Sequence, residues 1–261
     1  MKSFNQNSKI LNLSIIQFVV FIIINIFWMI NRNTFFRSIE TSNAVYINGF
    51  INIFIALAGV AIISSYSIVF STIKYDILLG FNMLIVYNLL PLLLQQKSMF
   101  GILILSTIVF TVYLSNQVVK KIINKYELES KIGRIIIGLI ITFFDLIFIS
   151  RGFTLLIKLV NTKIMTNEIS VGISDILICS IWTLVGLSFV KNKSIGNRLI
   201  YSVYINGTLL FLTLISYLIM YPLMTNTIFD QNALIVILGM SLFFIIPFIA
   251  LTKKKLTTAS T

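Results

Sequence analysis

Eight long apolar runs constrain most strongly what this chain can fold into. A helix needs about 20 apolar residues to cross the hydrocarbon core of a bilayer, and each run comes close to that length. Lipid offers no hydrogen-bond partners, so every spanning segment must satisfy its own backbone, which leaves helix bundles or closed barrels. The runs do not alternate with period two, as barrel strands do, so they favour helices. The expected spans are residues 10–30, 45–70, 77–94, 99–119, 135–156, 169–190, 199–223 and 233–251.

The composition agrees with this pattern. Hydrophobic residues make up 58% of the chain and charged residues 11%, against roughly 25% charged in soluble domains. The longest segment between spans is 120–134, which is too short to form a domain. The sequence therefore predicts an all-α, polytopic transmembrane helix bundle of about eight spans, a single integral membrane domain over residues 1–261.

The 77–94 run is the weakest of the eight spans. It is short and contains Asn82, Asn88 and Pro91. If it did not cross the membrane, the number of spans would be odd and the two ends of the chain would lie on opposite sides.

The basic residues provide an independent test of the topology. Cytoplasmic segments next to spans are enriched in Lys and Arg, and an N-terminus on the cytoplasmic side places fourteen of the twenty basic residues inside and five outside. Both termini are therefore predicted to be cytoplasmic. We attribute most of the +12 net charge to this asymmetry and to contact with lipid headgroups, and expect no nucleic-acid partner.

The residue inventory argues against most enzyme classes. The chain has no histidine, the commonest general base and metal ligand. Its single cysteine, Cys179, has no partner for a disulfide or a zinc site. We expect no enzymatic activity, no metal and no cofactor.

Three ionisable residues fall inside the predicted spans: Asp145, Arg151 and Asp175. Such residues cost at least about 2.5 kcal/mol each at a helix centre and commonly mark functional sites. Arg151 and Asp175 each lie seven residues, or roughly 10 Å, inside the outer ends of their spans at Lys158 and Glu168. We predict that they form an ion pair shielded from lipid. It would either bind or gate a solute, or specify packing.

Asp145 lies deeper, near the middle of its span. An isolated carboxyl group in an apolar site favours its neutral form, which suits a proton or cation site. The alternative is a structural, protonated Asp145 that bonds to Thr142, Asn206 or a backbone carbonyl. Helical spacing places it on one stripe with Gly138, Thr142, Ile149 and Gly152.

The sixth span also has a small and polar face, which suits a helix turned toward the bundle interior. We interpret this face as close helix packing. Its members are Gly172, Asp175, Cys179, Trp182 and Gly186.

Six asparagines in the spans have two interpretations. They could line a polar cavity, or they could link helices by hydrogen bonds worth about 0.6 kcal/mol each, and we favour helix links for most. These residues are Asn25, Asn48, Asn52, Asn82, Asn88 and Asn206.

The 120–134 segment contains Glu127 and Lys131, a favourable i,i+4 pair. A short cytoplasmic helix there could dock a protein partner, but we favour the interpretation that the segment is a basic linker that fixes the topology.

Two functions remain open. The chain is a permease-like transporter or the membrane subunit of one, in which Asp145, Arg151 and Asp175 line or gate a polar path. Transport would then be coupled to ions or to a separate ATPase partner. Alternatively, the chain is a non-catalytic accessory or immunity protein that acts through a toxin or secretion partner. In that case the outer residues Arg32, Phe35, Phe36 and Arg37 would carry recognition. The composition suits a multi-pass protein of a bacterial cytoplasmic membrane.

Overall fold

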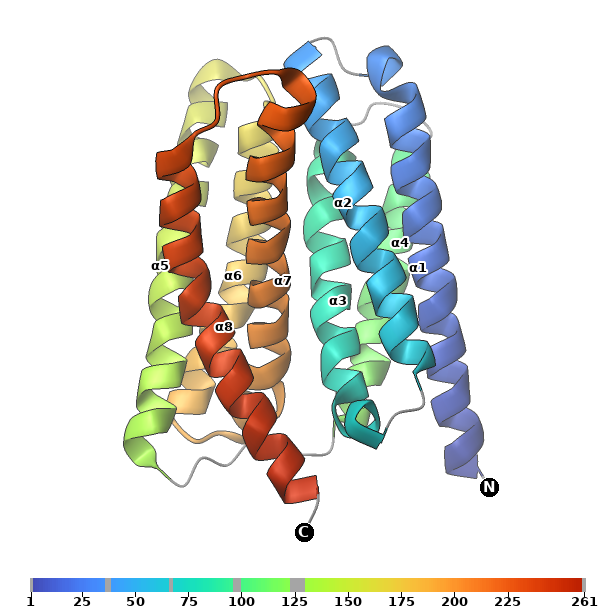
Figure 1. Cartoon of the computed structure of the whole chain (residues 1–261), viewed down its shortest axis with the longest axis vertical. Coiled ribbons are helices and arrows are strands. Elements are labelled where there is room, and N and C mark those ends of the chain that lie inside the picture. The colour runs from blue at the N-terminus through green and yellow to red at the C-terminus, as the bar shows by residue number, and fades with distance from the viewer. Residues whose placement is uncertain (1, 36–38, 66–67, 96–99, 123–129, 260–261) are drawn as a thin grey trace.

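The computed structural model describes residues 2–35, 39–65, 68–95, 100–122 and 130–259. Throughout these ranges the regular structure is helical, and the eight helices follow one another up and down the bundle (Figure 1). All eight are long and apolar enough to cross a membrane, which confirms the predicted number. They are α1 (Lys2–Phe35), α2 (Ile39–Ser64), α3 (Ile68–Gln95), α4 (Phe100–Lys121), α5 (Lys131–Thr162), α6 (Asn167–Val190), α7 (Ser194–Thr225) and α8 (Gln231–Ala259).

The boundary between the second and third spans differs from the prediction. The apolar run 45–70 was expected to be one span, but α2 ends at Ser64 and residues from Ile68 onward belong to α3. Hydroxyl side chains end the second helix, and Ser65 Oγ bonds back to the Ile62 carbonyl oxygen at 2.8 Å. The third span, predicted to be the weakest, therefore gains nine residues at its start, about two and a half turns, and reaches 28 residues with Pro91 inside it.

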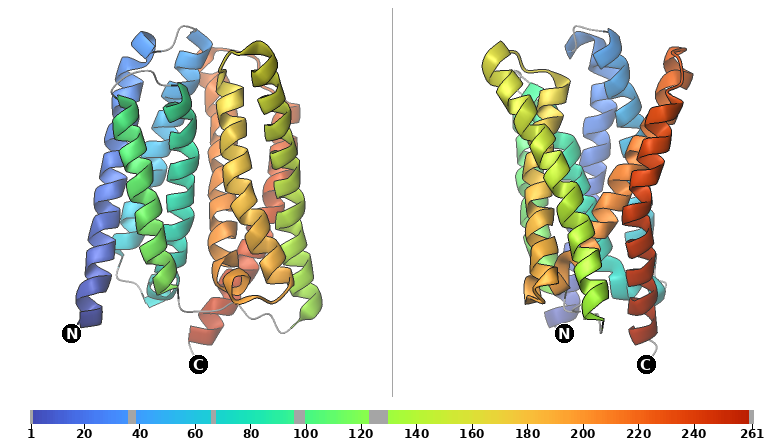
Figure 2. Two further views of the ribbon diagram at one scale, coloured as in Figure 1. Left: turned by 180° about the vertical axis from the view of Figure 1, so that it is seen from behind. Right: turned by 90° about the vertical axis from the view of Figure 1, so that its left-hand side faces the viewer.

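The helices form two groups of four, α1–α4 and α5–α8, which lie side by side (Figures 1 and 2). Helices α3 and α7 pack against each other across the two groups, and α6 and α2 complete this interface. The beginning of α1 and the end of α8 lie at the same end of the bundle, at the bottom of Figure 1. We call this the terminal end, and the opposite one the far end.

Helices α5 and α6 approach each other most closely at two pairs of glycines. A Cβ atom on Gly138 would lie 2.8 Å from the carbonyl oxygen of Gly186, and one on Gly152 would lie 2.5 Å from that of Gly172. Only glycine permits this separation. The pairs are fourteen residues apart on each helix, about 21 Å along the axis, which compares with a hydrocarbon thickness of about 30 Å for a bilayer. We call these four residues the glycine seam.

A turn of few residues joins α5 to α6 at the far end. Lys163 takes a left-handed conformation, with φ of 55°, and its N–H bonds to the Leu159 carbonyl oxygen. Thr166 then caps α6 by accepting from the Ile169 N–H at 3.3 Å. This short connection makes the two helices antiparallel neighbours and sets the register of the glycine seam.

Aromatic rings fill the core of the second group around Phe244. The ring centroid of Phe244 lies 5.0 Å from that of Phe211, 5.6 Å from Phe144, 6.0 Å from Trp182 and 6.1 Å from Tyr204. These rings come from α5, α6, α7 and α8 and therefore hold all four helices of the group together.

Candidate functional site

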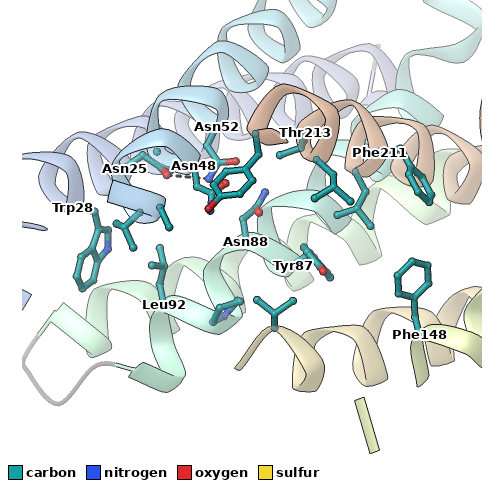
Figure 3. Close-up of a pocket in the computed structure, with 18 of the residues that line it drawn as sticks. Asn25, Trp28, Asn48, Asn52, Tyr87, Asn88, Leu92, Phe148, Phe211 and Thr213 are labelled. Carbon is teal, nitrogen blue, oxygen red and sulfur yellow. Dashed lines mark hydrogen bonds between the residues drawn. The ribbon is translucent and has the colours of Figure 1, made fainter. Parts of the chain in front are cut away.

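A cavity of about 310 Å³ lies between the two groups of helices (Figure 3). Side chains from α1, α2 and α3 line one side, and side chains from α5, α6 and α7 line the other. Each helix contributes residues from the half nearer its far end, such as Asn88 of α3 and Thr213 of α7. The cavity therefore occupies the far half of the bundle.

Asparagine side chains form one wall of the cavity. Asn25, Asn48, Asn52 and Asn88 all line it, and Asn52 Nδ2 donates to Asn25 Oδ1 at 3.1 Å, as the dashed line in Figure 3 shows. The buried Asn52 Oδ1 and Asn88 Nδ2 have no hydrogen-bond partner among the described residues. Buried polar atoms are nearly always paired. One acceptor and one donor in the asparagine wall are therefore unsatisfied.

The other two asparagines link helices instead. Asn82 Nδ2 donates to Ser115 Oγ of α4 at 3.2 Å, and Asn206 Nδ2 of α7 donates to the Gly80 carbonyl oxygen of α3 at 3.0 Å. The expectation of helix links holds for these two and for the Asn25–Asn52 pair, which links α1 to α2 as well as lining the cavity. Helical spacing alone could not show which asparagines line the cavity and which link helices.

The structure contains the predicted pairing of Arg151 and Asp175. Arg151 Nη1 lies 3.8 Å from Asp175 Oδ2, and Tyr87 of α3 donates its O–H to Asp175 Oδ1 at 2.8 Å. The predicted shielding is right for only one partner, because the Asp175 side chain is 3% exposed and that of Arg151 is 53% exposed. Helix α5 is peripheral and packs mainly on α6. The long side chain of Arg151 on this helix is therefore not enclosed. Arg151 lines the cavity, whereas Asp175 does not.

Asp145 is separate from this cavity. Its side chain is 0% exposed and lies midway along the glycine seam, seven residues from both Gly138 and Gly152. Thr183 of α6 donates to Asp145 Oδ2 at 3.4 Å, and Oδ1 has no hydrogen-bond partner among the described residues. The three residues singled out in the sequence therefore form one pair and one isolated carboxyl group.

Asp145 does not bond to Thr142 or Asn206, the two side chains named as its partners for a structural role. Thr142 Oγ1 donates to the carbonyl oxygen of Gly138 at 2.9 Å, because a hydroxyl in a helix readily bonds to the preceding turn. Asn206 is engaged with α3. The actual donor, Thr183, lies on the facing helix, which no pattern within α5 could identify.

Sequence analysis overlooked a further buried carboxylate, Asp76. It is 2% exposed within α3 and accepts a hydrogen bond from Ser202 Oγ of α7 at 3.4 Å. The predicted span started at residue 77, which placed Asp76 in a polar segment beside Lys74. The misplaced helix boundary contributed to the omission.

Close contacts between α3 and α7 lie below the cavity, toward the terminal end. Besides the Asp76–Ser202 and Gly80–Asn206 bonds, a Cβ on Gly80 would lie 2.6 Å from Ile205 Cγ2. The two groups are therefore tightly packed in this half and enclose the cavity in the other half.

Comparison with protein-family models, with characterised proteins and with solved structures finds no match to this chain. We therefore infer the function from the geometry of the site. In the part of the chain that the structure describes, no three acidic, cysteine or histidine side chains gather as a metal site would require.

The ion pair gives a first testable prediction. In a double-mutant cycle, Arg151→Gln and Asp175→Asn should each lower the stability of the purified protein, and the double variant should lose less than the sum. We expect a coupling energy of about 1 kcal/mol, since Arg151 is half exposed and its charge is partly screened. Reversible unfolding of the four proteins in detergent measures this energy. Strictly additive losses would show that the two charges do not interact.

Proposed function

We propose that this chain is a permease-like membrane protein, or the membrane subunit of a transporter, that binds a polar solute between its two groups of four helices. The observation that carries the proposal is the cavity, whose lining includes Asn52 and Asn88, each with one unpaired amide atom, among eight apolar helices. An unpaired polar group is costly in such surroundings, and a bound solute would satisfy it.

The distribution of basic residues supports an orientation for this site. Fourteen basic residues belong to the segments around the terminal end and five to those around the far end, so the terminal end is proposed to face the cytoplasm. The cavity then lies in the outer half of the membrane, and the α3–α7 contacts separate it from the cytoplasm. A bacterial cytoplasmic membrane suits this arrangement.

Passage of a solute would require the α3–α7 contacts to separate. Many transporters work by rocking two helix bundles around a central site. Here the hydrogen bonds Asp76–Ser202 and Gly80–Asn206 would break while the site opens toward the cytoplasm. An ATPase partner would supply the energy. The segment of this chain that is expected to dock the ATPase is 120–134. It includes residues 123–129, which lie outside the described residues.

The accessory or immunity role stays an alternative based on the sequence. The side chains of Arg32 and Phe35, expected to recognise a toxin or secretion partner, are not described by the structure, and Phe36 and Arg37 lie outside the described residues. The cavity favours the permease, because a protein that acts through its outer loops does not need an amide-lined interior.

A matched pair of asparagine variants tests the proposal. Asn88→Leu replaces a cavity amide with an apolar side chain of the same branching and should reduce uptake of the solute at least tenfold. Asn82→Leu makes the same change six residues earlier on α3, where the amide links α3 to α4, and should affect stability more than uptake.

The assay uses proteoliposomes supplied with a small-molecule extract of cells, whose contents are then identified by mass spectrometry. Orientation is measured separately by labelling Asn48→Cys with a membrane-impermeant maleimide, since the native Cys179 is buried. Accumulation of the same compounds in protein-free liposomes, or equal uptake by both leucine variants, would contradict the proposal.

A further inference from the structure

We propose that the ligand of the cavity is a small organic anion whose carboxylate or phosphate group binds Arg151. The inference rests on the proposed function, because it names the class of solute for the same cavity. It follows from three observations: the charge of the lining, the free donors of Arg151, and the unpaired amides on the opposite wall.

The charge of the lining is positive. Arg151 is the sole charged side chain that lines the cavity among the described residues, and its partner Asp175 is buried behind it, outside the lining. A solute in the cavity therefore meets the guanidinium group before the carboxylate. Because the surroundings are apolar helices, this charge is screened less than it would be in water.

Arg151 also has hydrogen-bond donors to spare. Its contact with Asp175 is 3.8 Å, which is too long for a hydrogen bond, and Tyr87 supplies the hydrogen bond to that carboxylate instead. The guanidinium group donates no hydrogen bond to any described side chain or carbonyl. Its planar arrangement of five N–H groups matches the two oxygens of a carboxylate or phosphate. An incoming anion could thus bind without breaking a protein hydrogen bond.

The asparagines on the opposite wall indicate which polar groups the ligand has besides its anionic end. Asn88 Nδ2 is a buried donor without a partner, and Asn52 Oδ1 is a buried acceptor without a partner. The complementary ligand has an acceptor and a donor away from its anionic end, as a hydroxyl or amino group provides. The volume of about 310 Å³ is near the lower limit for ligand pockets, about 300–1,000 Å³. The class is therefore a small hydroxylated or amino-substituted carboxylate or phosphate ester.

The same chemistry could come from a free solute or from a phospholipid headgroup. Trp28 lines the cavity and also a neighbouring apolar pocket of about 120 Å³, together with Phe27, Phe100 and Leu103. An acyl chain could occupy that pocket while its glycerol phosphate group binds Arg151. The test therefore includes both sources.

The test measures binding of glycerol 3-phosphate and glutamate to the full chain in phosphatidylcholine nanodiscs by calorimetry, with glycerol as the neutral counterpart. We expect at least one of the two anions to bind, glycerol not to bind, and Arg151→Gln to weaken the anion at least tenfold. Arg151→Lys should retain part of the affinity, since it keeps the charge but loses the planar donor arrangement.

Lys158→Gln is the matched control. Lys158 lies on the same helix, its side chain is equally exposed at 53%, and it pairs with Glu168 of α6 at 3.6 Å, but it does not line the cavity. This variant should bind the anion as the unmodified protein does. If Lys158→Gln lost as much affinity as Arg151→Gln, the effect would be a general effect of charge, and the inference would be overturned.

Phosphatidylglycerol distinguishes the two sources of the anion. If nanodiscs that contain it suppress glycerol 3-phosphate binding only when Arg151 is present, the ligand is a lipid headgroup. If they leave binding unchanged, the ligand is a free solute. Both outcomes support the anion site. Binding that survives Arg151→Gln, equal binding of glycerol, or no binding of either anion would overturn it.

Failure of the inference and failure of the proposed function give different results. Anion binding that depends on Arg151, without uptake into proteoliposomes, would keep the anion site and refute the permease. Uptake of neutral or cationic compounds that is indifferent to Arg151 would keep the permease and refute the anion site.

Discussion

Gly152→Leu is expected to prevent the protein from folding into a stable bundle. A Cβ at this position would lie 2.5 Å from the carbonyl oxygen of Gly172 and 2.6 Å from Ile176 Cγ1. Helix backbone cannot move aside as a side chain can, so α5 and α6 would have to separate along the glycine seam. Overpacking usually costs about 1–3 kcal/mol and occasionally more, and we expect this variant to exceed the upper value. Gel filtration in mild detergent and thermal unfolding measure the loss.

Gly239→Leu is the matched control for this variant. Gly239 lies in α8, and a Cβ there would meet no atom within 4 Å. Replacing this glycine should leave the gel-filtration profile unchanged and affect stability little. A normal profile for both leucine variants would show that α5 and α6 do not pack through the glycines. Equal damage in both would show that leucine is harmful for a reason unrelated to the seam.

Arg198→Ala is expected to cause the second largest loss of stability. Arg198, in the first turn of α7, donates Nε to the Ile122 carbonyl oxygen at 3.0 Å and Nη2 to that of Val119. Val119 lies in the last turn of α4 and Ile122 directly follows the helix, where carbonyl groups lack the i+4 N–H partner of a helix interior. The Val119 carbonyl oxygen also accepts the Ile122 N–H at 3.3 Å. Hydrogen bonds from a charged donor contribute about 1.5–3 kcal/mol each. Losing both should cost about 3 kcal/mol and weaken the attachment of the first group of helices to the second at the terminal end.

Two further variants make the Arg198 prediction specific. Arg198→Lys should recover part of the loss, since it restores a positive charge beside the negative end of the α4 dipole but cannot reach both carbonyls with fixed geometry. Lys191→Ala removes an exposed charge from the neighbouring turn and should be nearly neutral. Unfolding in detergent compares the three proteins. A loss for Lys191→Ala as large as that for Arg198→Ala would indicate that only net charge matters.

The two structural predictions concern different parts of the proposed transport cycle. The glycine seam joins α5 and α6, which supply Arg151 and Asp175, so its rigidity holds the wall of the cavity in place. Arg198 connects α7 to α4 across the two groups, and its hydrogen bonds must adapt if the groups rock. A weakened Arg198 contact is therefore expected to alter uptake rates, whereas a weakened seam removes the site itself.

Along single helices, the sequence predicted most of what the structure contains. The number of spans follows from hydropathy, because bilayer thickness requires a minimum length of apolar helix. The Arg151–Asp175 pair follows from equal depth and opposite charge on consecutive antiparallel spans. The small-residue faces of α5 and α6 follow from helical periodicity. In each case the information lies within one helix or within two helices joined by a short turn.

Contacts between helices distant in sequence could not be predicted from single helices. Periodicity shows which face of α3 is polar, but not that α7 covers part of this face while another part remains open as the cavity. Asn88 and Asn82 are six residues apart on one helix, yet one lines the cavity and the other bonds to α4. The burial of Asp76 could not be predicted for the same reason, since it depends on a helix distant in sequence: Ser202, its partner on α7, lies 126 residues further along the chain. The sequence alone determined the number of spans, their depth and their faces, because the bilayer imposes these on each helix separately. Only the tertiary structure decided which faces meet and where the cavity lies, because that depends on how all eight helices pack at once.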